Sequence, residues 1–310
     1  MKKGSFAPAG GWLPIVAAMV AVYVVWGSTY LAIRIALEGF PPLLMAGLRF
    51  LVAGGVLFAV LWLRGAPAPS ARQWRAAALV GGLLLLGGNG GVVVAEQWVA
   101  SGLAALGVAA VALWSALFAG LWGQWPRRLE WVGLAVGFAG VVMLNLEGGL
   151  RASPAGAAAL LVGTVSWALG SMWSRRLDLP SGLMASAAEM LAGGAMLIVA
   201  GIAAREEVPH AVAPRPLLAL AYLIVFGSWV GFSAYLFLLR RVRPAAATSY
   251  AYVNPVIAMF LGVALGGETI TASEWAAMPV ILAGVAIVMI GHNRASTPTP
   301  AAERHGTVRS

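Results

Sequence analysis

Long apolar runs, separated by short connections that carry charge, proline or glycine, occupy the chain from Trp12 to residue 291. The first run is longer than the apolar core of about 7 to 15 residues found in signal peptides, so we interpret it as a retained membrane span. Nine further runs follow, many of them near the roughly 20 residues that cross a bilayer as a helix. The pattern predicts ten transmembrane helices, at residues 12–33, 42–63, 76–98, 101–123, 131–146, 155–174, 182–203, 217–239, 245–266 and 275–291.

The composition agrees with a membrane protein. Hydrophobic residues make up 61% of the 310 residues and charged residues only 10%, against about 25% charged residues in soluble domains. The 39 glycines are typical of membrane helices whose backbones approach one another closely. The composition therefore excludes an ordinary soluble globular protein.

Several functional classes lack their motifs. The basic residues are scattered between apolar runs, which argues against a nucleic-acid partner in spite of the net charge of +9. No Gly-rich loop ends in Gly-Lys-Ser/Thr, so ATP hydrolysis is not expected. The chain has no cysteine, and its histidines (His210, His292 and His305) fall in a loop or tail, which leaves no metal cluster or catalytic triad. We expect a protein that is not an enzyme and needs no cofactor or metal.

The distribution of Lys and Arg predicts the orientation. With a cytoplasmic N-terminus, fifteen basic residues fall on the inner side, and only Arg151, Arg205 and Arg215 fall on the outer side. This excess follows the positive-inside rule. We expect a multi-pass protein of a bacterial-type cytoplasmic (inner) membrane with both termini in the cytoplasm.

An internal repeat divides the chain into two halves. Three short motifs recur at one offset of 144 residues: Gly123-Gln124 with Gly267-Glu268, Glu130-Trp131 with Glu274-Trp275, and Ala139-Gly140-Val141 with Ala283-Gly284-Val285. Five spans in each half force the second half to enter the membrane upside down, an arrangement typical of secondary transporters that bind substrate at the repeat interface.

The predicted fold is therefore an all-α membrane protein with ten transmembrane helices, arranged as two inverted-topology repeats of five around a central cavity. Its parts are a cytoplasmic N-terminus (1–11), a first repeat (12–147), a second repeat (154–291) and a disordered cytoplasmic tail (292–310).

A set of short motifs resembles the EamA-type permeases of the drug/metabolite transporter superfamily. The resemblance runs from about Trp12 to Ile290, and the motifs are Trp26-Gly-Ser-Thr-Tyr30, Arg49-Phe50, Gly88-Asn89 with Glu96-Gln97 and Ser101-Gly102, Glu189-Met190, Ala247-Thr-Ser-Tyr-Ala-Tyr-Val-Asn-Pro255, Gly267-Glu268 and the two Ala-Gly-Val segments. It implies ten helices in two inverted halves, a central cavity, and export or exchange of small metabolites, often amino acids. One departure is that Asn254-Pro255 corresponds to Ala110-Val111 in the first half, so the two halves need not move alike.

Asn89 and Glu96 stand out in the third predicted span because ionisable and amide groups are costly in lipid. Glu96 could couple transport to protons or bind a substrate ammonium group, or it could be hydrated or paired near the outer end of its span. Asn89 lies deeper, and we predict that it contacts the substrate.

Arg49 and Glu189 occupy nearly equivalent positions in the two repeats. They could bind the two ends of a zwitterion or pair with each other, and the ion pair is favoured because unpartnered buried charges are costly.

Two stripes with helical spacing could line access routes to the cavity. Trp26, Tyr30 and Arg34 form one stripe, and Trp167, Ser171 and Arg175 form the other. Both arginines are gate candidates, although an arginine near a helix end commonly snorkels to the interface, and for Arg175 we favour that interpretation.

Five more residues complete the candidate set. Tyr250 and Asn254 share a face, and Pro255 removes a backbone hydrogen bond beside them, which could create a hinge. Trp114 and Trp229 could stack on a substrate or contact lipid and other helices.

These features favour a secondary transporter that exports or exchanges small organic metabolites, with amino acids as the leading class, by alternating access. Its expected partners are a small-molecule substrate and the lipid bilayer, with a monomer as one option for assembly. The alternatives are efflux of hydrophobic drugs and an intramembrane enzyme or lipid-handling protein. The last would need a catalytic pair, and the only deep carboxylates, Glu96 and Glu189, sit in different repeats.

Overall fold

The computed structural model describes residues 12–98, 101–144, 154–207, 209, 211–266 and 272–293. The N-terminal segment 1–11, the link between the predicted repeats, the Gly267-Glu268 motif and the tail from residue 294 lie outside the described residues. Within them every element of regular secondary structure is a helix, and no strand is formed.

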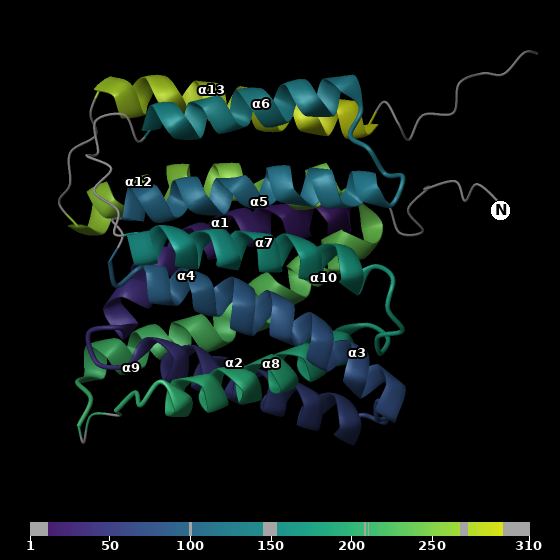
Figure 1. The fold of residues 1–310 in the computed structure, drawn as a ribbon, viewed down its shortest axis with the longest axis vertical. Helices are drawn as coiled ribbons and strands as arrows, with labels where there is room; N and C mark the ends of the chain where they lie inside the picture. Colours follow the sequence, from purple (N-terminus) through teal and green to yellow (C-terminus); the bar gives the residue numbers. More distant parts are fainter. Residues whose placement is uncertain are drawn as a thin grey trace, which may run out of the picture.

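The helices lie side by side with nearly parallel axes (Figure 1). They are α1 (Leu13–Ala36), α2 (Pro42–Leu63), α3 (Ala71–Gly81), η1 (Gly82–Asn89), α4 (Gly90–Ala95), α5 (Ser101–Leu121), α6 (Arg128–Leu144), α7 (Pro154–Ser174), α8 (Leu183–Ala203), α9 (Pro214–Tyr222), η2 (Leu223–Phe232), α10 (Ser233–Arg241), α11 (Pro244–Ala247), α12 (Tyr250–Gly266) and α13 (Ala272–Asn293).

Among the described residues, six helical segments are long and apolar enough to cross a membrane, and α5 and α13 contain shorter apolar stretches. The six segments are Leu13–Ala36, Pro42–Leu63, Ala71–Ala95, Pro154–Ser174, Leu183–Ala203 and Pro214–Arg241. The structure therefore supports a polytopic helical membrane protein.

Three predicted boundaries differ in detail. The span predicted at 76–98 begins earlier, because Ser70 and Gln73 form a capping box ahead of Ala71, and it ends at Ala95. The span predicted at 245–266 is broken into α11 and α12. Residues 292 and 293, predicted to belong to the tail, are helical because α13 continues to Asn293.

Two π-helical segments interrupt otherwise α-helical elements. The segment η1 joins α3 to α4, and η2 joins α9 to α10. In η2 the Ser228 hydroxyl donates to the Leu223 carbonyl at 3.2 Å, five residues back. A π segment shifts the helical register and is frequent at functional sites.

The arginine-rich connections lie at one end of the bundle, at the right in Figure 1, where α2 joins α3, α5 joins α6, α7 joins α8 and α10 joins α11. We call this the basic end. An ion pair stabilises it: Arg243 donates from Nε to Glu130 Oε1 at 2.7 Å and from Nη2 to Glu130 Oε2 at 3.0 Å. This pair connects the start of α6 with the segment before α11.

Packing is closest at the two edges of the bundle. The helices α6 and α13 pack together at one edge, and α2 and α8 at the opposite edge (Figure 1). Between the edges, α5 packs on α7 and α1 on α12, while α7 also contacts η1 and α1 contacts η2. These inner contacts surround the middle of the bundle, where the cavity lies.

Candidate functional site

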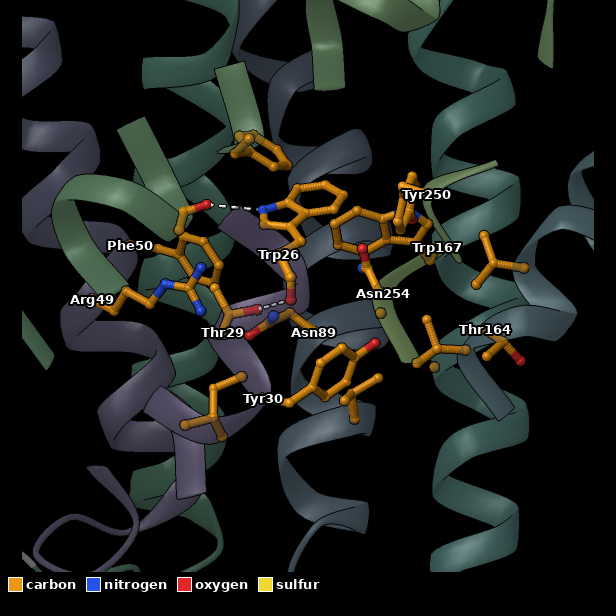
Figure 2. Close-up of a pocket in the computed structure, with 18 residues that line it drawn as sticks. Trp26, Thr29, Tyr30, Arg49, Phe50, Asn89, Thr164, Trp167, Tyr250 and Asn254 are labelled. Carbon is orange, nitrogen blue, oxygen red and sulfur yellow. Dashed lines mark hydrogen bonds between the residues drawn. The ribbon is translucent and has the colours of Figure 1, made fainter. Parts of the chain in front are cut away.

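A cavity lies between the inner helices (Figure 2). Its walls come from α1, α2, η1, α4, α5, α7, η2 and α12. The lining residues are Trp26, Thr29, Tyr30, Ile33, Arg49, Phe50, Gly88, Asn89, Val92, Val108, Val111, Gly163, Thr164, Trp167, Gly227, Phe232, Tyr250 and Asn254.

An aromatic cluster closes the cavity toward the basic end. The Trp26 ring lies 5.4 Å from that of Trp167, 5.1 Å from that of Tyr235 and 4.9 Å from that of Tyr250. Trp167 donates from Nε1 to the Tyr235 hydroxyl at 3.2 Å, and Tyr235 shares a 2.6 Å hydrogen bond with Ser171. On α1 the cavity-lining residues run from Trp26 toward the C-terminal end, away from the basic end. Trp26, Trp167 and Tyr250 therefore form the floor of the cavity, and the Tyr235 ring packs against all three.

Glycines of the π-helical segments make room for the two tryptophans. A Cβ on Gly88 would lie 2.7 Å from Trp167 Cε3, and one on Gly231 would overlap Trp26 Nε1. Trp26 Nε1 also donates to the Gly227 carbonyl at 3.1 Å. Trp26 thus packs against η2, which follows it in the chain, and Trp167 packs against η1, which precedes it.

Arg49 is the only charged residue among those that line the cavity, and it is 3% exposed to solvent. Its Nε donates to Ser228 Oγ at 2.9 Å, and its guanidinium carbon lies 4.6 Å from the centroid of the Phe50 ring. No carboxylate of the described residues forms an ion pair with it. The cavity therefore contains a positive charge that no acidic side chain neutralises.

Asn89 adds an unused hydrogen-bond acceptor. Its Oδ1 is buried and has no partner within the described part of the chain. In Figure 2 Asn89 lies below the Trp26 ring, with Arg49 and Thr29 at the left of the view and Trp167 and Tyr250 at its right. The cavity wall thus combines polar groups with aromatic rings.

Asn254 has a structural partner. When the side-chain amide is oriented with its nitrogen toward these acceptors, the nitrogen donates to the backbone carbonyls of Tyr23 and Tyr250 at 3.2 and 3.1 Å. Its residue is 1% exposed. Asn254 therefore links α12 to α1 at the wall of the cavity, directly before Pro255.

The expected ion pair between Arg49 and Glu189 is wrong. Both Glu189 oxygens are buried without a hydrogen-bond partner, and no ion pair joins the two residues. The helix α2 starts at the end of the bundle opposite the basic end, and Arg49 lies seven residues after this start (49 − 42). The helix α8 starts at the basic end, and Glu189 lies six residues after that start (189 − 183). At about 1.5 Å per residue they are roughly 12 Å apart along the bundle.

Glu96 and Glu189 do not line the cavity. Glu96 is the C-cap residue of α4, and both its carboxylate oxygens are buried without a hydrogen bond to any residue that the structure describes. Glu189 is fully buried, and its backbone lies against Gly81 of α3, where a Cβ would come within 2.5 Å of the Glu189 carbonyl oxygen.

The remaining candidates also lie outside the lining residues. Arg34 is exposed, and Arg175 donates to the backbone carbonyls of Leu239 and, at 2.9 Å, Val242, so it ties the end of α7 to the end of α10. Trp229 donates to the Ala53 carbonyl at 2.7 Å, and Trp114 stacks on Phe118 at 6.5 Å. Trp229 thus makes the contact with another helix that was the alternative to substrate stacking, whereas the Trp114 contact lies within α5.

Some site residues have only a weak signal in the sequence. Thr29 and Phe50 fall within motifs that carry the family resemblance. Ser228, Phe232 and Tyr235 lie in an apolar run in which the polar residues do not recur at the spacing of an α-helix. Their place depends on η2, and no pattern of apolar residues distinguishes a π-helix from an α-helix.

The chain is similar to known transporters over most of its length. The model of the EamA-like transporter family matches residues 13–146 and again residues 154–290. A relative from Escherichia coli K12, named "Uncharacterized inner membrane transporter YedA", is 50% identical over 280 residues, which cover 90% of this chain and 92% of the relative. A relative from Salmonella typhimurium, named "Probable amino-acid metabolite efflux pump", is 26% identical over 293 residues, covering 87% of this chain and 93% of the relative.

A solved crystal structure has the same fold. It superposes with a TM-score of 0.75 over 91% of this chain and 99% of its own, at 23% sequence identity.

Proposed function

The chain belongs to the EamA-like transporter family, and from this premise we propose that it is a secondary transporter of the inner membrane that exports or exchanges small organic metabolites by alternating access. Amino acids are the leading class of substrate. The E. coli relative is named an inner membrane transporter, and the Salmonella relative is named for amino-acid metabolite efflux, which supports both parts of this proposal.

We further propose the architecture of ten transmembrane helices in two inverted repeats, 12–147 and 154–291. Exchanging the two halves converts one observed contact into another: α5 with α7 corresponds to α12 with α1, and α7 with η1 corresponds to α1 with η2. The tryptophans Trp26 and Trp167 each contact a glycine in the π segment of the other half. This symmetry of contacts supports the repeat independently of the recurring motifs.

The single observation that carries the proposed function is the cavity. It lies between helices of both proposed repeats and combines a buried arginine and an amide with aromatic walls. Transporters built from inverted repeats bind substrate at such an interface near the middle of the membrane. The aromatic floor on the basic side corresponds to the closed half of an alternating-access cycle, with the basic end in the cytoplasm.

Flux measurements test this proposal. The purified protein is reconstituted into proteoliposomes preloaded with an unlabelled amino acid, and uptake of the radiolabelled compound is followed for a panel that includes aromatic residues, Met and Thr. We expect counterflow of at least one member, with empty liposomes as the control. Absence of counterflow for the whole panel would contradict an amino-acid substrate.

The aromatic floor favours a second candidate, efflux of hydrophobic compounds. The rings of Trp26, Trp167 and Tyr250 line the cavity and provide it with apolar contacts. Overexpression would then raise drug tolerance of a sensitive bacterial strain. Unchanged tolerance across a panel of lipophilic drugs would count against this candidate.

A further inference from the structure

The unneutralised charge of Arg49 restricts what the cavity can bind. The guanidinium lies in a wall that is otherwise uncharged, and its described partners are the neutral Ser228 hydroxyl and the Phe50 ring. A charge removed from water is strongly disfavoured unless an opposite charge or several hydrogen bonds compensate it. A ligand with a negative group would supply that compensation, and a cationic ligand would be repelled.

The shape of guanidinium favours a carboxylate. Its planar arrangement of N–H donors matches the two oxygens of a carboxylate. Because Nε is already bonded to Ser228 at 2.9 Å, the terminal nitrogens remain for the ligand. The same hydrogen bond fixes the direction of the guanidinium.

Asn89 defines a second contact. Among the described residues no group donates to its Oδ1, and in Figure 2 Asn89 lies below the Trp26 ring, next to Thr29 and with Arg49 to its left. A hydroxyl or amino group on the carbon next to the carboxylate could donate to it. Such a donor would pair an acceptor that is otherwise left unsatisfied, which is costly in a buried site.

The rest of the cavity fits a flat apolar group. Trp26, Trp167 and Tyr250 line the cavity, and the Trp26 ring contacts the other two rings edge to face, so this part of the wall is an aromatic surface. A phenyl or indole side chain would cover this surface by ring contacts.

We propose that the cavity is a binding site for small aromatic carboxylates, in which Arg49 binds the carboxylate and Asn89 accepts a hydrogen bond from a 2-hydroxy or 2-amino group. An ammonium group is not required, so 2-hydroxy acids bind at least as tightly as the corresponding amino acids. This inference rests on the proposed function, because it takes the cavity to be the substrate site of the transporter.

Four ligands that share a phenyl ring test the proposal on the full-length wild-type chain in nanodiscs by isothermal titration calorimetry. They are 3-phenyllactate, phenylalanine, 3-phenylpropionate and phenethylamine. We expect 3-phenyllactate to bind at least as tightly as phenylalanine and about tenfold more tightly than 3-phenylpropionate, which lacks the donor for Asn89. Phenethylamine, which lacks the carboxylate, should not bind measurably.

Three variants locate the contacts. Arg49→Gln should weaken 3-phenyllactate binding about 10- to 100-fold, and Arg49→Lys should weaken it less because the charge remains. Asn89→Leu should abolish the difference between 3-phenyllactate and 3-phenylpropionate. Arg205→Gln is the matched control, because Arg205 is exposed beyond α8 and its loss removes the same charge without altering the cavity.

The outcomes separate this inference from the proposed function. Binding of phenethylamine as tight as that of 3-phenyllactate, equal effects of Arg49→Gln and Arg205→Gln, or no binding of any of the four ligands would overturn the inference. Amino-acid flux could persist in each of these cases. Conversely, Arg49-dependent carboxylate binding without amino-acid flux would support the inference and contradict the proposed amino-acid transport. The wild-type ligand series remains decisive even where a variant does not fold.

Discussion

At the scale of single residues, buried polar groups in this bundle differ in what satisfies them. Glu130 is paired by Arg243, and Asn254 reaches two backbone carbonyls. Glu189, by contrast, is fully buried with two unpartnered oxygens. Stability alone gives no reason for a carboxylate at that position.

A substitution at Glu189 tests this view. Glu189→Met replaces the carboxylate by an apolar side chain of similar volume, so the free energy of unfolding should be unchanged or higher, because an unsatisfied buried polar group is removed. Thermal unfolding of the detergent-solubilised protein measures it. Glu130→Met is the comparison and should lower the midpoint, since it strands Arg243. A clear loss of stability in Glu189→Met would show that the carboxylate has a partner.

The sequence identifies residue types at the site better than their contacts. Of the residues predicted to bind substrate, the structure places seven at the cavity: Trp26, Tyr30, Arg49, Asn89, Trp167, Tyr250 and Asn254. It places four outside the lining, Glu96, Glu189, Trp114 and Trp229, as well as the gate and hinge candidates Arg34, Arg175 and Pro255. Their role in binding stays a prediction. The Arg49–Glu189 expectation failed because equivalent positions of inverted repeats lie at opposite depths, which a comparison of residue numbers does not show.

At the scale of elements, the apolar runs identify most helices because a lipid-exposed backbone must satisfy its own hydrogen bonds. The runs cannot locate η1 and η2, nor the break between α11 and α12. These features depend on packing: glycines such as Gly88 and Gly231 admit an indole ring at the point where the helix widens. Neither the π-helical segments nor the break has a characteristic spacing of apolar residues in the sequence.

The adjacent glycines Gly54 and Gly55 of α2 test how closely α2 and α8 pack. A Cβ on Gly54 would lie 2.9 Å from Leu191 N, whereas one on Gly55 would meet nothing nearer than 3.9 Å. Gly54→Ala should therefore lower the free energy of unfolding by about 1 to 3 kcal/mol. Gly55→Ala should be neutral or stabilising by about 0.5 to 1 kcal/mol, because alanine favours the helix. Thermal unfolding compares them, and equal effects would contradict close packing at Gly54.

At the scale of the whole molecule, the proposed orientation, with the arginine-rich end in the cytoplasm, rests on the positive-inside rule. That end includes the connection between α2 and α3, whereas the connection between α8 and α9 lies at the other end (Figure 1). The chain contains no cysteine, so a single introduced thiol reports on one site without background.

Two exposed positions report on the two ends. Ala68→Cys lies between α2 and α3, and Glu207→Cys lies after α8. In intact spheroplasts a membrane-impermeant maleimide should label Glu207→Cys, and it should label Ala68→Cys only after the membrane is permeabilised. The reverse pattern would place the basic end outside and contradict the proposed orientation.

The central claim is that substrate passes through the cavity between the two halves, and Val92→Cys tests it most directly. Val92 lines the cavity one turn beyond Asn89, so a bulky thiol reagent on Val92→Cys should block counterflow in proteoliposomes, and saturating substrate should slow the labelling. The same reagent on Glu207→Cys should leave counterflow unchanged. Complete labelling of Val92→Cys with undiminished counterflow and no protection by substrate would contradict the claim.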